Sequence, residues 1–198
     1  MMPFSRLGAL ALVVAAAGLA ACATQAPPAS APAAAAKPAA SAAATDAKLF
    51  FTVLPESGRI HAFGDTRNYF DFLSHGEVVL TRTRIGEGPG GRTLVYGITS
   101  DDVKTNQPSL GERVMAGTLP AAPDFYGEAF KNGRYYVFGN LKDMKDFIAF
   151  GEVPYSYTDI GAGPKGETLV YVMNKDSYAK GKPNDRVARF KALRASAK

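Results

Sequence analysis

The hydrophobic pattern along the chain changes character twice. Residues 7–19 form a nearly continuous apolar run, whereas residues 23–47 are mostly Ala, Pro and Ser without an apolar period. From residue 48 onward, short apolar segments alternate with turn residues, which is typical of a folded domain rich in strands. We therefore expect the folded part to begin near residue 48.

The folded part contains a sequence duplication. When the chain is shifted by 75 residues, 58–96 lies over 133–171 without a gap, and 19 of the 39 positions are identical. Chance alone would match only a few of these positions. The match predicts two repeats at 48–103 and 123–178, a linker at 104–122 and a separate tail at 179–198.

Both repeats predict the same order of elements, two strands, a short helix and two more strands. Asn132-Gly133 favours a hairpin turn between the first two strands. Asp65 and Asn140 are suited to cap the start of a short helix with one apolar stripe, which would end at Gly76 in the first copy and at Gly151 in the second. The third strand is predicted at 77–85 in the first copy and 152–160 in the second. The pattern thus predicts an α+β fold of two tandem ββαββ repeats, each with one short helix on a mainly antiparallel sheet, packed as a pseudo-symmetric unit.

The first 22 residues have the anatomy of a secretory signal, with a positively charged start and an apolar run too short for an ordinary membrane span. The run ends in Leu19-Ala20-Ala21-Cys22, which resembles the lipobox of bacterial lipoproteins. The resemblance implies removal of residues 1–21 and attachment of lipid to Cys22, the only cysteine. Ala23 stands where an Asp would indicate inner-membrane retention, so the resemblance favours the outer membrane, facing the periplasm.

The segment 22–47 is expected to be a disordered tether, because its prolines prevent a continuous helix and it offers almost nothing to bury.

The positive net charge of +5 comes from the other end of the chain. Residues 48–178 hold 14 Lys and Arg against 16 Asp and Glu, whereas the tail holds seven against Asp185. This distribution argues against nucleic acid as a partner and predicts a short basic helix in the tail. The helix packs on the repeats, or it touches anionic lipid, lipopolysaccharide or other anionic envelope polymers.

Candidate catalytic groups are few. Each copy keeps one Arg and one Glu, Arg59 with Glu77 and Arg134 with Glu152, which we interpret as structural pairs between neighbouring strands. The glycine-rich segments 86–91 and 161–166 lie between strands and are read as hairpin turns instead of phosphate loops. The two histidines, His61 and His75, belong to no catalytic motif, and the chain predicts no metal and no cofactor.

The two copies differ in their third strands, and function can diverge where copies differ. Alternation places Arg82 and Arg84 on one face, and the matching face of the second copy carries Tyr155, Tyr157 and Asp159. Three interpretations stay open: two solvated faces, a packing contact between the repeats with Arg82 over Tyr157 and Arg84 near Asp159, or a ligand groove lined by these residues.

The leading functional hypothesis is a membrane-tethered envelope lipoprotein that acts as a non-enzymatic binding or scaffolding module. Its partners would be the lipid bilayer, through acylated Cys22, and an envelope protein or anionic polymer. One alternative is a periplasmic, hydrolase-like enzyme with a site between the repeats, which would need a cleft joining His61, Glu77 and a hydroxyl group. Another is an inhibitor or immunity-type protein that exposes the segment 104–122.

Overall fold

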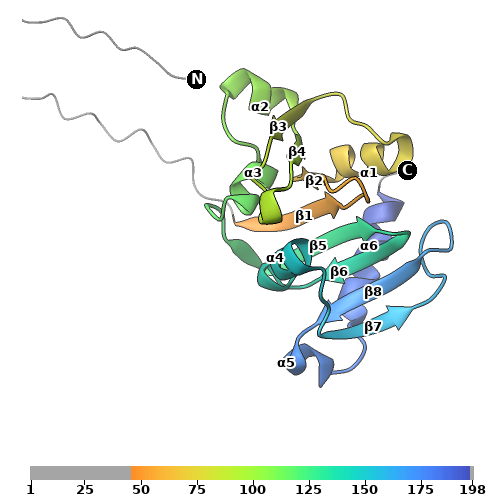
Figure 1. Cartoon of the computed structure of the whole chain (residues 1–198). Helices are drawn as coiled ribbons and strands as arrows, with labels where there is room; N and C mark the ends of the chain where they lie inside the picture. Colours follow the sequence, from red (N-terminus) through yellow and green to blue (C-terminus); the bar gives the residue numbers. More distant parts are fainter. Residues whose placement is uncertain (1–45, 197–198) are drawn as a thin grey trace, which may run out of the picture. The chain divides into compact units, whose positions relative to one another are not determined.

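The computed structural model describes residues 46–196, which form one mixed eight-stranded sheet with helices on both faces (Figure 1). The signal segment, Cys22 and the Pro-rich segment lie outside the described residues. The strand order is β3-β4-β2-β1-β5-β6-β8-β7, so the first four strands make one half of the sheet and the last four make the other. Among the helices of residues 46–196, none combines the length and the apolarity that a membrane span requires.

In the first half, β1 pairs antiparallel with β2, β2 pairs parallel with β4, and β4 pairs antiparallel with β3. The second half repeats these relations with β5, β6, β8 and β7. The halves meet where β1 and β5 run parallel in the centre of the sheet. The strands are β1 Ala47–Val53, β2 Ile60–Phe63, β3 Thr81–Arg84, β4 Leu94–Gly97, β5 Ala121–Lys131, β6 Arg134–Phe138, β7 Tyr155–Asp159 and β8 Thr168–Met173.

The sheet is mixed, whereas the sequence pattern predicted a mainly antiparallel one. The pairs β2–β4, β1–β5 and β6–β8 are parallel. In each half, a helix and the third strand carry the chain back before the fourth strand begins, so the second and fourth strands run in the same direction. Parallel neighbours need such a crossover, because a tight turn cannot join them.

The central strands alternate between two apolar cores, one on each face. Phe50 belongs to the core under α3 and α4, and the adjacent Phe51 belongs to the core under α1 and α6. Both phenylalanines are fully buried, which explains why the sequence shows a run of apolar residues there in place of a strict alternation. The helices are α1 Thr66–His75, η1 Pro89–Gly91, α2 Ser100–Thr105, α3 Leu110–Met115, α4 Leu141–Phe150, α5 Lys175–Tyr178 and α6 Asn184–Ala195.

The predicted helices form where the caps and the apolar stripes place them. The Asp65 side chain accepts a hydrogen bond from the Asn68 backbone N–H at 2.8 Å, and Gly76 ends α1 with a φ of 79°. Asn140 caps α4 in the same way, and Gly151 ends it. The apolar stripe of α4 is buried against the sheet, as its spacing predicted.

The third strands are shorter than predicted. β3 begins at Thr81 and β7 at Tyr155, where the ladders with β4 and β8 begin. Val79 is 97% exposed and Ile85, just after β3, is 83% exposed. The structure also contains helices that the repeat pattern did not predict: α2 crosses the predicted boundary between the first repeat and the linker, α3 lies inside the linker, and α5 follows the fourth strand at the end of the second repeat.

Candidate functional site

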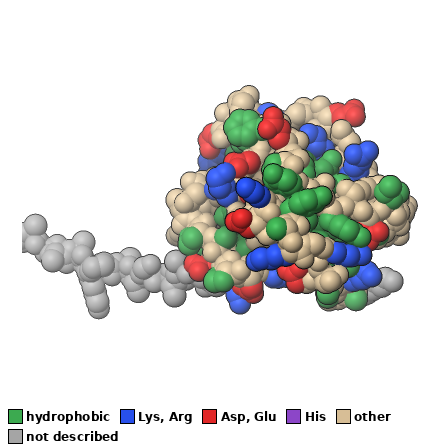
Figure 2. Space-filling model, turned by 90° about the horizontal axis from the view of Figure 1, so that it is seen from below, with side chains coloured by type: hydrophobic (Ala, Val, Ile, Leu, Met, Phe, Trp, Pro, Cys, Tyr) green, Lys and Arg blue, Asp and Glu red, His purple; other side chains and the backbone are tan. Residues whose placement is uncertain are grey.

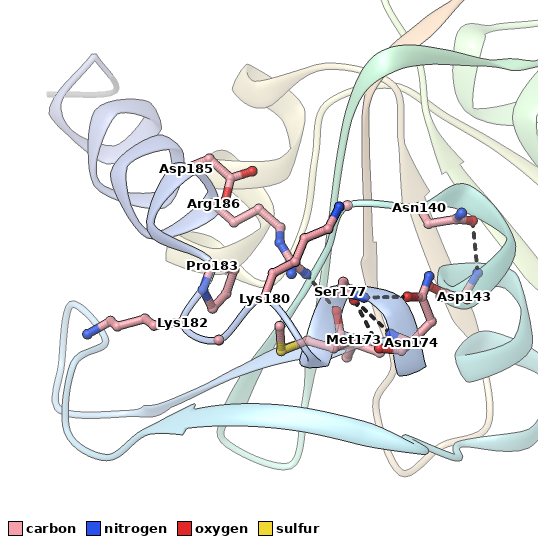
Figure 3. Close-up of a pocket in the computed structure, with 13 residues that line it drawn as sticks. Asn140, Asp143, Met173, Asn174, Ser177, Lys180, Lys182, Pro183, Asp185 and Arg186 are labelled. Atoms are coloured by element: carbon pink, nitrogen blue, oxygen red, sulfur yellow. Dashed lines mark hydrogen bonds between the residues drawn. The ribbon is translucent and has the colours of Figure 1, made fainter.

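A cavity of about 350 Å³ lies in the second half of the molecule, where the chain leaves the ends of β6 and β8 (Figure 3). Its walls come from the start of α4, the short α5 turn and the start of α6. Its volume is at the lower end of the range for ligand pockets, roughly 300 to 1,000 Å³. The charged and polar residues of the lining are Asn140, Asp143, Asn174, Ser177, Lys180, Lys182, Asp185 and Arg186.

Arg186 is the central feature of this cavity. The residue is only 8% exposed, and its side chain extends from the first turn of α6 toward the strand ends (Figure 3). Its Nη1 donates hydrogen bonds to the carbonyl oxygen of Val172 at 2.6 Å and to that of Val137 at 3.5 Å. Both bonds use Nη1, so Nε and Nη2 are left without a hydrogen-bond partner among residues 46–196.

The charge of Arg186 is not neutralised by a contacting acid. Within the part of the chain that the structure describes, no ion pair within 4.0 Å includes this residue. Burial lowers the pKa of the guanidinium, and the more distant charges of Asp185 and Asp143 raise it. A buried charge without a partner is costly, so a polar site that holds one favours an incoming anion.

Gly139 makes room for this arginine. A Cβ atom on Gly139 would lie 3.3 Å from Cδ of Arg186, which is tight but leaves a flexible side chain as the neighbour. At the corresponding turn of the first half, a Cβ on Gly64 would lie 2.7 Å from Cβ of Leu110 and 2.9 Å from the backbone N of Gly111. In the first half, therefore, α3 packs directly on the turn after β2, whereas a long side chain separates α6 from the turn after β6.

Two lysines line the cavity in different ways. The Lys180 side chain rises beside Arg186 in the space between α6 and Asn140, whereas Lys182 points away from it (Figure 3). Lys182 instead lies 3.9 Å from a carboxylate oxygen of Asp159 and 5.0 Å from the ring centroid of Tyr157. The cation that remains available to a ligand, besides Arg186, is therefore Lys180.

Asp143 is the acid on the opposite wall. It belongs to the first turn of α4 and is half-buried. Burial raises the pKa of its carboxyl group, and the nearby charges of Lys142 and Arg186 oppose that shift. Lys142 forms its ion pair with Asp146, at 2.6 Å, and Asp143 takes part in no ion pair among residues 46–196. Unpaired charges of both signs thus line one cavity.

A buried cluster below α6 fixes the position of that helix. The fully buried Glu128 accepts hydrogen bonds from the hydroxyl groups of Tyr69 and Tyr126, at 2.5 and 2.8 Å. Arg194, in the last turn of α6, donates to both carboxylate oxygens, at 2.5 and 3.1 Å. Burial alone would lower the pKa of Arg194, but Glu128 raises it above its usual value. Burial and Glu128 also raise the pKa values of both tyrosines.

The sequence did not indicate this cluster or the Arg186 site. Glu128 and Arg194 lie outside the gapless match between the copies, and Arg186 was counted only as part of a basic tail. A charged residue inside the apolar strand 125–130 was the one available signal, because buried acids are retained in strands when a partner neutralises them.

The residues of the divergent third strands do not come together. Arg82 and Arg84 lie on β3 and Tyr155, Tyr157 and Asp159 on β7, which are the two opposite edge strands of the sheet. The expected contact of Arg82 with Tyr157, and the shared groove, are therefore not formed, because the halves join through β1 and β5 and the third strands are outermost. Arg82 and Arg84 instead contact Glu112 of α3, at 2.6 and 3.5 Å.

The predicted structural pairs do not form either. Arg59, Glu77, Arg134 and Glu152 are all exposed, and no ion pair among residues 46–196 joins them. Both glutamates lie between the end of a helix and the start of the third strand, outside the strand ladders. They therefore cannot be cross-strand neighbours of the arginines.

A second cavity, of about 460 Å³, lies between elements of the two halves, among η1, β4, α3 and α4. Burial, together with Glu112 and Glu87, raises the pKa of its Tyr96 to about 12. Neither His61 nor Glu77 lines it. His61 packs against Phe72, with ring centroids 4.5 Å apart, and Nδ1 of His75 lies 3.0 Å from the Asp71 carbonyl oxygen.

The edge formed by β7 and α5 exposes aromatic side chains. The rings of Tyr155 and Tyr178 lie 5.3 Å apart, and Ile160 beyond β7 is also exposed. Figure 2 views the molecule from this side and shows apolar side chains gathered between Lys and Arg side chains. An apolar edge with basic surroundings is a surface on which a partner can pack.

Comparison with models of known protein families, with curated proteins and with solved structures gives no match for this chain.

Proposed function

We propose that this protein is a membrane-tethered envelope lipoprotein whose folded part is a non-enzymatic binding module. Its ligand presents an oxyanion, a carboxylate or a phosphate, to the cavity between α4 and α6. The lipid anchor is Cys22, residues 22–47 are the tether, and the location is the outer membrane, facing the periplasm. The ligand is either free there or displayed by an envelope protein or anionic polymer.

The observation that carries the proposal is the environment of Arg186. Its guanidinium is buried, lines the cavity and has no acid within ion-pair distance among the described residues. Planar guanidinium groups bind carboxylates and phosphates through two parallel hydrogen bonds, and Nε and Nη2 are the pair of donors left for such a contact. The exposed Lys180 adds a second cation at the same cavity.

We also propose that the two halves are duplicated ββαββ copies, related by a pseudo-twofold axis that runs along β1 and β5. Three observations support this. The copies share 19 of 39 aligned residues. The strands of each half pair in the same order. The copies place α1 and α4 against opposite faces of the sheet, which is what a rotation about such an axis would produce.

The binding proposal is tested with the full-length chain in detergent, using acetate and inorganic phosphate as probes in calorimetry. We expect at least one probe to bind and Arg186→Gln to weaken that binding by about tenfold or more, as loss of a charge-assisted contact does. Lys180→Ala should weaken it by several-fold. Lys191→Ala, which removes an exposed charge elsewhere on α6, is the matched control and should have no effect.

Arg186 also holds two strand carbonyls, so Arg186→Gln can reduce stability. Lys180 makes no such contact, and its substitution keeps the test valid if the arginine variant does not fold. The proposal fails if neither probe binds, or if binding is the same in Lys180→Ala and Lys191→Ala.

A further inference from the structure

We infer that the ligand of this cavity is a small free amino acid with an apolar side chain, whose carboxylate pairs with Arg186 and whose ammonium group pairs with Asp143. This inference rests on the proposed binding function and narrows it from any oxyanion to a zwitterion. Four features of the cavity support it: a cationic wall at Arg186, an acidic wall at Asp143, the balance of charge and the apolar part of the lining.

On the cationic wall, only one nitrogen of the Arg186 guanidinium has hydrogen-bond acceptors among residues 46–196. Nη1 of Arg186 is occupied by the carbonyl oxygens of Val172 and Val137. These bonds orient the guanidinium plane but leave its charge uncompensated, because carbonyl groups carry no net charge. A carboxylate that accepts from Nε and Nη2 would supply both the missing hydrogen bonds and the missing charge.

The acidic wall lacks a cation in the way that the cationic wall lacks an anion. Asp143 lines the cavity from α4, across from Arg186 on α6 (Figure 3). The two side chains are farther apart than 4.0 Å, since they form no ion pair. Its chain neighbour Lys142 is paired with Asp146 instead. A half-buried carboxylate that faces a guanidinium without contacting it leaves space for a molecule with charges of both signs between them.

The balance of charge favours a neutral zwitterion over a polyanion. The lining holds Lys180, Lys182 and Arg186 against Asp143 and Asp185, and Lys182 is turned toward Asp159. Two cations and two acids then face the ligand. A phosphate dianion would be repelled by the two acids. An amino acid would instead place its carboxylate at Arg186 and its ammonium group at Asp143.

Part of the remaining lining is apolar. Val172, Met173 and Pro183 contribute to the cavity, and all three are buried. A cavity of about 350 Å³ accommodates a single small molecule and not a folded partner. An aliphatic side chain such as that of alanine, valine or leucine would meet apolar groups here, whereas a charged side chain would lose its hydration without gaining a partner from them.

The test is calorimetry on the full-length chain in detergent with alanine, valine and leucine, each compared with its N-acetyl derivative, its amide and acetate. We expect at least one free amino acid to bind at least tenfold more tightly than its N-acetyl form, which lacks the ammonium group, and than its amide, which lacks the carboxylate. Asp143→Asn should remove the preference for the free amino acid over the N-acetyl form. Glu152→Gln, at an exposed acid just beyond the end of α4, is the matched control and should keep it.

The outcomes separate this inference from the proposed function. Equal binding of an amino acid and its N-acetyl form would overturn the inference of a zwitterionic ligand, as would binding of acetate with no binding of amino acids. Either result would leave the proposed oxyanion site standing. An unchanged preference in Asp143→Asn would also overturn it. If neither acetate, phosphate nor any amino acid binds, both the inference and the proposed function fall. The comparison of ligands uses the unmodified chain, so it does not depend on how well a variant folds.

Discussion

Two arginines of α6, Arg186 and Arg194, extend into the interior of the molecule, and they differ in what compensates their charge. Arg194 pairs with the buried Glu128, and two tyrosine hydroxyl groups complete the hydrogen bonds of that carboxylate. Among residues 46–196, Arg186 donates hydrogen bonds only to carbonyl oxygens. The first arrangement is closed and holds the helix in place, whereas the second leaves donors and charge for a ligand. We propose that this difference in what neutralises the charge separates the structural Arg194 from the ligand-binding Arg186.

The Glu128 cluster predicts a large effect on stability. Glu128→Gln would leave Arg194, whose side chain is only 15% exposed, without its counter-charge, so we expect the free energy of unfolding to fall by about 3 kcal/mol. Urea denaturation measures this change. Glu152→Gln, at an exposed acid with no ion pair among residues 46–196, is the control and should change stability by less than about 0.5 kcal/mol. Similar stability of the two variants would contradict the assigned role of the cluster.

His61 predicts a dependence of stability on pH. Burial against Phe72, with help from the charge of Arg59, lowers the pKa of His61 below its usual value of 6.5. The unfolded chain therefore takes up the proton first as the pH falls. The contribution of neutral His61 to stability should be complete above pH 6.5 and decrease as the pH falls toward the lowered pKa.

Denaturation measured between about pH 7.5 and 5 would check this, because His61→Gln should flatten the decrease in stability over that interval. His75→Gln, at the exposed end of α1, serves as the comparison. If His61→Gln shows the same loss of stability on acidification as the unchanged chain, another group is responsible.

At the scale of elements, the two halves use the turn after their second strand in different ways. Gly64 lies against the backbone of α3, whereas Gly139 lies against the flexible side chain of Arg186. The same residue type thus allows close helix packing in one half and a cavity in the other. In the binding function that we propose, the two halves therefore diverge in the segment after the fourth strand, and not in the third strands.

Substitution of each glycine by alanine should distinguish close helix packing at Gly64 from space for Arg186 at Gly139. Gly64→Ala would force backbone atoms of α3 away and should destabilise the protein by about 1 to 3 kcal/mol. Gly139→Ala requires only that Arg186 shift, so we expect a smaller loss of stability together with weaker ligand binding. Thermal denaturation and calorimetry of both variants measure these effects, and a larger loss of stability in Gly139→Ala than in Gly64→Ala would contradict the packing described.

The elements that could be predicted are those with local signals. Asp65 and Asn140 at the helix starts, and Gly76 and Gly151 at the ends, act through neighbouring backbone groups, so the sequence contains the information. The parallel pairing of β1 with β5 could not be predicted in this way, because it depends on where the chain returns after α3. Arg186 escaped notice for the same reason: its carbonyl partners lie on strands that are distant in sequence.

At the scale of the whole molecule, the sheet has free edges at β3 and β7, and its helices leave no described span for a membrane. The attachment that we propose is the lipid on Cys22. Cys22→Ala should move the protein from the membrane to the soluble fraction without changing calorimetric ligand binding. Fractionation of cells that express each form measures this, and retention of the variant in the membrane fraction would argue against the anchor.

The central β1–β5 pair has a consequence for biosynthesis. β1 is among the first folded segments to leave the ribosome, yet its partner β5 follows only after the whole first half and the segment that contains α3. Until then β1 is an unprotected edge that carries Phe50 and Phe51, whose side chains are fully buried in the finished sheet. A chain exported in an unfolded state would need a holding chaperone during that interval, and early termination after the first half would yield an aggregation-prone fragment.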